Sequence, residues 1–178
     1  MSKQRRLSTV NERVLDPDDF KAAFRDHPAG VAVITADAGD GPVALTATSV
    51  ASVSAEPPLI MFSVSAMSSS TPTIRRAETV VVHLLAADQL DLAKLASTSG
   101  IDRFADTSVW KVLPTGETYF PSARSWIRAR VLEVVAAGSS SIILVEALES
   151  KPVDEAAAVP LVYHNRTWHS LGNHSRIE

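Results

Sequence analysis

The segment that most constrains the fold is RSWIRARVLEVVAAGSSSIILVEALES, residues 124–150. It holds two long strand candidates, 124–136 and 140–150, separated by the turn residues Ala137-Gly138-Ser139. Alternate positions of the first run form two faces. The apolar face carries Ile127, Ala129 and Val131, and the more polar face carries Trp126, Arg128 and Arg130. Two such runs at hairpin distance predict a pair of long antiparallel strands.

Shorter apolar runs lie on both sides of this hairpin. Those predicted to be strands are residues 31–36, 43–53, 59–64, 79–85, 161–164 and 167–169. Most neighbouring runs are joined by turn residues, such as Asp40-Gly41, and not by helical crossovers. The pattern predicts a mainly β fold: an antiparallel, Greek-key-like β-barrel with a few added helices.

The first helix is predicted to begin after Asp16. Asp16 is a good N-cap and Pro17 suits the first helical position. Phe20, Ala23 and Phe24 recur at helical spacing, so we expect this stripe to face a core.

Two further helices and one long loop complete the expected elements. A short helix starts at Thr71-Pro72 and ends near Arg76, and another covers residues 87–96. Residues 97–122 are predicted to be a loop. In the strand over 79–85, Val80, Val82 and Leu84 are expected to share one face.

Composition and length narrow the class of protein. The chain has 178 residues, 46% of them hydrophobic, and a net charge of −3, which is typical of one ordinary globular domain and not of a nucleic-acid binder. With no cysteine, thiol catalysis, thiolate metal sites and disulfides are excluded. No apolar run approaches the length of a membrane span. We expect a cytoplasmic protein with one domain over residues 16–172, a flexible N-terminal tail over 1–15 and a C-terminal tail over 173–178.

The sequence contains no common catalytic motif in the structural context that the motif requires. Residues 39–44 match a dinucleotide-binding pattern by letters, but a strand follows the glycines where a helix is required. The five histidines form no helical metal-ligand pair; His164 and His169, five apart across a turn, are the nearest approach to one. If the protein is an enzyme, a cofactor supplies its reactivity.

Hydroxyl side chains are unusually dense between Val43 and Thr71. For Thr46 to Ser49, which lie between apolar runs, a polar ligand against the strand is the favoured account, because an unpaired buried hydroxyl costs free energy. For Ser68 to Ser70 taken alone, solvent or local backbone partners are the favoured account. The helix start at Thr71-Pro72, with Arg75 and Arg76 one turn further on, would suit a phosphate.

Six short motifs occur in one order between about Asp16 and Leu171. They are Phe24 with residues 28–35, then 45–49, 52–60, 68–71, 102–105 with Trp110, and 160–164. Together these motifs resemble the flavin reductase-like family. Three positions depart from its pattern: Ala44 replaces a glycine, Val50 replaces an aromatic residue, and Asn165-Arg166 displaces the glycine that follows the tyrosine–histidine pair.

The resemblance implies a split β-barrel that forms a homodimer. It implies binding of FMN or FAD and hydride transfer to that flavin from NADH or NADPH. It also implies a flavin-dependent monooxygenase component as partner, supplied by diffusing reduced flavin.

The same resemblance assigns roles to particular positions. Thr46, Ala47, Thr48 and Ser49 line the isoalloxazine ring; Ser63, Ser68, Ser69, Ser70 and Thr71 approach the ribityl chain and phosphate; Asp102, Arg103 and Phe104 lie near the cofactor or the dimer interface; His164 lies beside the nicotinamide.

Two other interpretations remain open at this point. A flavin-binding protein without turnover could use the same barrel for storage, sensing or electron relay. An oxidase of the pyridoxamine-phosphate type is a third possibility, disfavoured by the scarcity of clustered Arg and Lys around the expected phosphate site.

Overall fold

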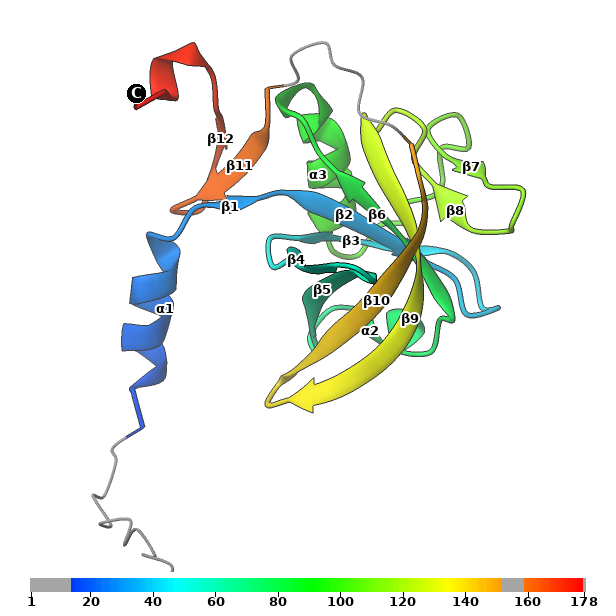
Figure 1. Ribbon diagram of the computed structural model, residues 1–178, viewed down its shortest axis with the longest axis horizontal. Coiled ribbons are helices and arrows are strands. Elements are labelled where there is room, and N and C mark those ends of the chain that lie inside the picture. Colours follow the sequence, from blue (N-terminus) through cyan, green and yellow to red (C-terminus); the bar gives the residue numbers. More distant parts are fainter. Residues whose placement is uncertain (1–13, 152–158, 178) are drawn as a thin grey trace, which may run out of the picture.

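A computed structural model describes residues 14–151 and 159–177, so most of the predicted N-terminal tail and residue 178 lie outside the described residues. Figure 1 shows a β-rich body from which the first helix projects. The helices are α1 (Pro17–Arg25), α2 (Thr71–Ile74) and α3 (Leu90–Ser97), with 3₁₀ turns η1 (Ala87–Gln89) and η2 (Asn173–Ser175). The strands are β1 (Ala29–Gly30), β2 (Ala32–Ala36), β3 (Val43–Ala47), β4 (Ala51–Ala55), β5 (Pro58–Ser65), β6 (Thr79–Leu84), β7 (Lys111–Val112), β8 (Thr118–Tyr119), β9 (Ser125–Ala137), β10 (Ser140–Ser150), β11 (Leu161–His164) and β12 (Thr167–Ser170).

The main sheet curls into a barrel. Within the described residues it has seven strands in the order β3-β2-β6-β9-β10-β5-β4, all paired antiparallel. Its two edge strands, β3 and β4, are consecutive in the chain and joined only by residues 48–50. Such a link spans at most about 14 Å, so the two edges must lie close together.

The seam of the barrel is closed by a side chain. The ladders of the described residues join β3 only to β2 and β4 only to β5, so the sheet stays open between them. Ser49, in the link, bridges this gap: its Oγ accepts from Ser63 N–H at 3.0 Å and donates to Ser63 O at 3.2 Å. The mainly β, antiparallel fold with a split barrel is confirmed.

The predicted hairpin over residues 124–150 forms the spine of the sheet. β9 and β10 pair from Ala137↔Ser140 onward, with irregular steps after Leu144 and Ala147. Such bulges increase the twist and help a long hairpin to follow the curve of the barrel. β9 also pairs with β6 and β10 with β5, so this hairpin joins the two halves of the sheet.

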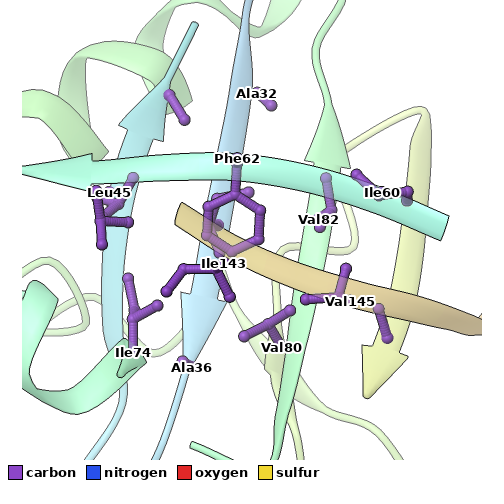
Figure 2. Close-up of a cluster of buried hydrophobic side chains, with 14 of the residues drawn as sticks. Ala32, Ala36, Leu45, Ile60, Phe62, Ile74, Val80, Val82, Ile143 and Val145 are labelled. Atoms are coloured by element: carbon purple, nitrogen blue, oxygen red, sulfur yellow. The ribbon is translucent and has the colours of Figure 1, made fainter. Parts of the chain in front are cut away.

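The main core fills the inside of the curl. Figure 2 shows Phe62 of β5 and Ile143 of β10 packed against Val80 and Val82 of β6. All four side chains are fully or almost fully buried. They occupy alternate positions of their strands, as the two-residue period of a strand with one face on a core requires.

A second cluster packs on the other side of β2 and β6. It includes Ala93 and Ala96 of α3, Phe104, Phe120 and Leu161. β6 is therefore buried on both faces over most of its length, whereas Leu84, predicted to share the face of Val80 and Val82, is 42% exposed.

One polar side chain, His83 of β6, is completely buried next to this second cluster. Its Nδ1 donates to Val33 O and its Nε2 accepts from Phe120 N–H, both at 3.0 Å. These two bonds fix the neutral tautomer, and desolvation lowers the pKa of His83 from 6.5 to about 4 despite the opposing hydrogen bonds to backbone. His83 thus ties the segment around Phe120 to the barrel.

The prediction that Phe20, Ala23 and Phe24 face a core is wrong for the described chain. No residue of α1 is buried, and Phe20 and Phe24 are 51% and 60% exposed. The helix projects from the body (Figure 1) and is fastened at its C-terminal end, where Asn165 N–H donates to Arg25 O at 3.1 Å. Helical periodicity specifies an apolar face, not what covers it.

Two segment predictions also need correction. The single strand expected over 43–53 is interrupted at residues 48–50, because the chain crosses there from one edge of the sheet to the other. The expected loop over 97–122 contains the small hairpin of β7 and β8. Its two-residue strands are too short to produce an alternation that the sequence could reveal. In the described residues, no helix is long and apolar enough to cross a membrane.

Candidate functional site

Two open hollows flank the C-terminal end of β3. The first has a volume of ≈ 340 Å³, and its polar lining consists of Thr46, Ser68, Ser69, Ser97, Ser99 and Arg103; we call it the Arg103 hollow. The second has a volume of ≈ 350 Å³ and is lined by Thr48, His164 and the face of α1 that carries Phe20 and Phe24; we call it the His164 hollow. Since Thr46 lines one and Thr48 the other, the end of β3 lies between them.

Arg103 is the cationic group of the first hollow. Its Nη2 donates to Thr98 O at 2.8 Å, just after α3. Its Nε is buried and has no hydrogen-bond partner among the described residues. A buried N–H on a charged guanidinium without a partner is costly, so this atom points to an absent acceptor.

The segment around Arg103 is held firmly by its neighbours. Asp102 Oδ1 accepts from Phe104 N–H at 2.9 Å, and Trp110 Nε1 donates to Phe104 O at 2.9 Å. The Phe104 ring is buried, stacks on Phe120 and meets Trp110 edge-on. The Asp-Arg-Phe motif and Trp110 thus form one unit that fixes the backbone of Arg103.

Several hydroxyls in the 43–71 segment already have protein partners. Thr46 Oγ1 donates to Ala93 O at 2.7 Å, Ser70 Oγ to Ala44 O at 2.8 Å and Thr71 Oγ1 to Ser65 O at 2.6 Å. Ser49 bridges the seam, as described above. The density of hydroxyls therefore does not by itself require a ligand, because these four attach β3 to α3 and to the residue before α2, the link after β3 to β5, and α2 to the end of β5.

The other residues of the 43–71 segment that were predicted to contact the flavin differ in exposure. Thr48, Ser63 and Ser69 are exposed, and Ala47 is buried in the main core. Ser68 is partly buried, and its Oγ accepts weakly from Ser70 N–H at 3.4 Å. Only Thr46, Thr48, Ser68 and Ser69 of the predicted hydroxyl positions line one of the two hollows.

The helix start at which a phosphate was expected belongs to a short element, α2. α2 has only four residues, and its N-cap makes no side-chain hydrogen bond. Arg76 pairs with Asp40 at 2.6 Å on the surface, which lowers the pKa of the Asp40 carboxyl. Neither Arg75 nor Arg76 lines the Arg103 hollow. Ser97, the last residue of α3, and Ser99 also line this hollow, and no sequence pattern predicted them to belong to a site.

His164 lies at the end of β11 and is partly buried. Its Nε2 donates to Asp26 Oδ1 at 3.0 Å, which connects the hollow to the C-cap of α1. Next to it in the sequence, Tyr163 packs on Trp168 with ring centroids 4.7 Å apart. The ring centroids of His164 and His169 are 5.6 Å apart. Asp26 and the two phenylalanines of α1 were not predicted to belong to a site. Among the described residues, no cluster of three or more acidic or imidazole side chains could hold a metal ion.

Comparison with known proteins identifies the family to which this architecture belongs. The family model for the flavin reductase-like domain matches residues 24–172, most of the chain. The chain belongs to this family.

Named relatives of this flavin reductase-like chain agree on one activity. An NADH:FMN oxidoreductase of Rhodococcus erythropolis is 45% identical over 148 residues, covering 82% of this chain and 77% of the relative. A solved structure of a flavin reductase domain protein from Arthrobacter sp. FB24 superposes with a TM-score of 0.81 at 30% identity, covering 87% of this chain and 95% of the other. BorF, the flavin reductase component of a bacterial two-component tryptophan halogenase, superposes with a TM-score of 0.78 at 28% identity, covering 89% and 99%.

Proposed function

We propose that this protein is an NAD(P)H-dependent flavin reductase that transfers hydride from the nicotinamide to FMN or FAD. The observation that carries the proposal is the buried, unpartnered Nε of Arg103 in a hydroxyl-lined hollow. It is supported by the 45% identity to an NADH:FMN oxidoreductase.

The Arg103 hollow fits the phosphate of a flavin nucleotide. Arg103 offers a fixed guanidinium with one N–H already anchored to Thr98 O and another left free. Ser68 and Ser69 add exposed or partly exposed hydroxyls on the opposite wall. A charged donor together with short hydroxyl donors is the chemistry that binds phosphate oxygens.

The end of β3 then suits the ring of the flavin. It separates the Arg103 hollow from the His164 hollow, and Thr48 faces the latter. A bound flavin supplies the ring that accepts the hydride. The task of this chain is to orient the two reactants, and no acid–base pair of side chains is required for it. We assign the backbone around Ala47, whose side chain is buried in the main core, to contact with the ring, and His164 to positioning the nicotinamide.

One assay tests the function. Purified protein is mixed with NADH and a catalytic amount of free FMN, and the absorbance at 340 nm is followed, then repeated with FAD and with NADPH. Flavin-dependent consumption of NADH or NADPH is the expected result. A protein that binds flavin but is inert with both nicotinamides would overturn the proposal in favour of a non-catalytic flavin-binding module.

Replacing His164 by alanine should raise KM for NADH roughly 3- to 10-fold, because the variant loses the binding free energy of about one hydrogen bond. FMN affinity should stay nearly unchanged, because His164 does not line the Arg103 hollow. Steady-state kinetics with varied NADH, alongside FMN titration, measures both. His169→Ala is the matched control, since His169 lies next to His164 but does not line the hollow. A variant that loses FMN and keeps its KM for NADH would contradict the assignment.

We further propose that two copies form a homodimer. Two apolar surfaces support this: the Phe20–Phe24 stripe of α1, and the outer face of the sheet, where Met61 pairs with Leu144 and Val135 with Ile142. A projecting helix and a bare sheet face on one chain suit a two-fold interface in which each copy covers the other.

Light scattering after size-exclusion chromatography should give twice the mass of one chain. Changing both Phe20 and Phe24 to serine should move the protein towards the monomer, while Val112→Ser, on a separate exposed strand, should not. A monomeric wild type would refute the dimer.

The product of the reaction suggests the physiological partner. BorF is the reductase component of a two-component system, and a reduced flavin released from an open hollow can diffuse to a second enzyme. We propose a flavin-dependent monooxygenase component as that acceptor.

A further inference from the structure

Two arginines at the edge of the His164 hollow have no partner among the residues that the structure describes. Arg25, in the last turn of α1, and Arg166, in the turn between β11 and β12, both line it. Within residues 14–151 and 159–177 neither side chain makes a hydrogen bond or an ion pair, whereas Arg76, Arg128 and Arg130 are paired with carboxylates. Unpaired guanidinium groups on one concave surface attract an anionic ligand.

The backbone at Arg166 is in an unfavourable conformation. Asn165 and Arg166 have φ of 47° and 62°, both in the left-handed region. Asparagine tolerates this region, but the second position of such a hairpin turn is usually glycine, because a side chain there is crowded. An arginine at this position therefore strains the backbone, and backbone strain of this kind is typical of functional sites.

The same turn is joined to α1. Asn165 N–H donates to Arg25 O at 3.1 Å, so the backbones that carry the two arginines are in direct contact. Asp26, the adjacent carboxylate, is engaged with His164 at 3.0 Å. The lining also includes three aromatic side chains, which are Phe20 and Phe24, with ring centroids 4.7 Å apart, and Tyr163. Lys21 lines the hollow as well, but it is paired with Asp18 at 3.0 Å.

Aromatic surfaces with two free guanidinium groups fit a ligand with planar rings linked by a pyrophosphate. We propose that Arg166, with Arg25, binds the pyrophosphate of NADH and makes this protein selective for the dinucleotide over nicotinamide mononucleotide. The inference rests on the proposed reductase function and deepens it. FAD carries the same linkage, so the test separates the two sources.

The test uses Arg166→Gly, with FMN as the acceptor because FMN has no pyrophosphate. We expect KM for NADH to rise roughly 5- to 10-fold with kcat unchanged, because the lost interaction is uniform binding. KM for reduced nicotinamide mononucleotide and KM for FMN should not change. The thermal midpoint should stay equal or rise, because glycine is relaxed at this φ. Arg176→Gly is the control: it removes an exposed arginine that does not line the His164 hollow, and it should leave KM for NADH unaltered.

Titration with ADP-ribose, which has the pyrophosphate but no nicotinamide, makes the test independent of turnover. Wild type should bind it, and Arg166→Gly should bind it weaker by the same factor as KM rises. The inference is overturned if the variant keeps wild-type affinity for NADH and ADP-ribose. It is also overturned if the mononucleotide loses as much as NADH, or if only KM for FAD rises. A wild type that binds ADP-ribose through Arg166 but oxidises no NADH would refute the proposed function and leave this binding site standing.

Discussion

Replacing Arg103 by methionine should weaken FMN binding roughly 10- to 100-fold, because a charge-assisted hydrogen bond to phosphate contributes about 1.5–3 kcal/mol. Methionine keeps the length of the side chain and removes the charge and every donor. The fold should survive, since the guanidinium makes a single hydrogen bond within the described residues, to Thr98 O, and Asp102 and Phe104 hold the backbone independently. Fluorescence quenching of FMN on titration with protein measures the affinity.

Riboflavin provides the internal control for this variant. It has the ring and the ribityl chain but no phosphate, so Arg103→Met should bind it as wild type does. The preference of wild type for FMN over riboflavin should then disappear in the variant. Arg75→Met is the matched protein control, because Arg75 is exposed and does not line the hollow. Equal losses for FMN and riboflavin would show that Arg103 acts on the ring or on folding, not on the phosphate.

The second large effect is a loss of stability in mild acid caused by His83. Because the pKa of His83 is about 4 in the folded chain, against 6.5 for an ordinary histidine, the unfolded chain takes up a proton between these pH values that the folded chain does not. The free energy of unfolding is therefore greatest above pH 6.5, falls as the pH drops through this window, and loses about 3 kcal/mol by pH 4. Urea unfolding at pH 7.5, 6, 5 and 4.5 measures it.

His83→Gln isolates this contribution. Glutamine is neutral at every pH used, so the variant should be less stable than wild type at pH 7.5, and the difference should shrink as the pH falls. His169→Gln is the control, because His169 is exposed and its loss should leave the wild-type pH profile unchanged. The pKa of Glu117 is lowered although desolvation opposes this shift. Glu117 therefore stabilises the fold at pH values above the pKa it has in the unfolded chain. This contribution is lost only below the pH range of the urea measurements. A wild-type profile parallel to that of His83→Gln would contradict the assignment.

Much of the fold follows from local patterns. The hairpin over 124–150 and the strand after Gly30 are long or apolar enough to be recognised, and the N-cap at Asp16 forms as expected, with Asp16 Oδ1 accepting from Asp18 N–H at 2.9 Å. The break at residues 48–50 could not be predicted, because it depends on closure of the barrel by strands far away in sequence. The exposure of Phe20 and Phe24 has the same origin: a pattern gives the apolar face of α1, and only tertiary structure shows that this chain leaves it uncovered.

The candidate site was predictable only in part. The motifs drew attention to Thr46, Ser68 and Arg103, which the fold brings to one hollow. Reasoning from hydroxyl density could not tell ligand-facing groups from structural ones, since Ser70 and Thr71 look alike in sequence and both bond to distant carbonyls. Nor could it find Asp26, which is 138 residues from His164 in the sequence. It also could not find Arg25 and Arg166, because only the structure shows that neither is paired within the part of the chain it describes.

A crystal structure of the protein with FMN tests the central claim most directly. The account predicts the phosphate within hydrogen-bonding distance of Arg103 Nε and the hydroxyls of Ser68 and Ser69, with the ring extending past Thr46 towards Thr48 and the His164 hollow. FMN bound elsewhere, with the Nε of Arg103 still lacking an acceptor, would contradict it.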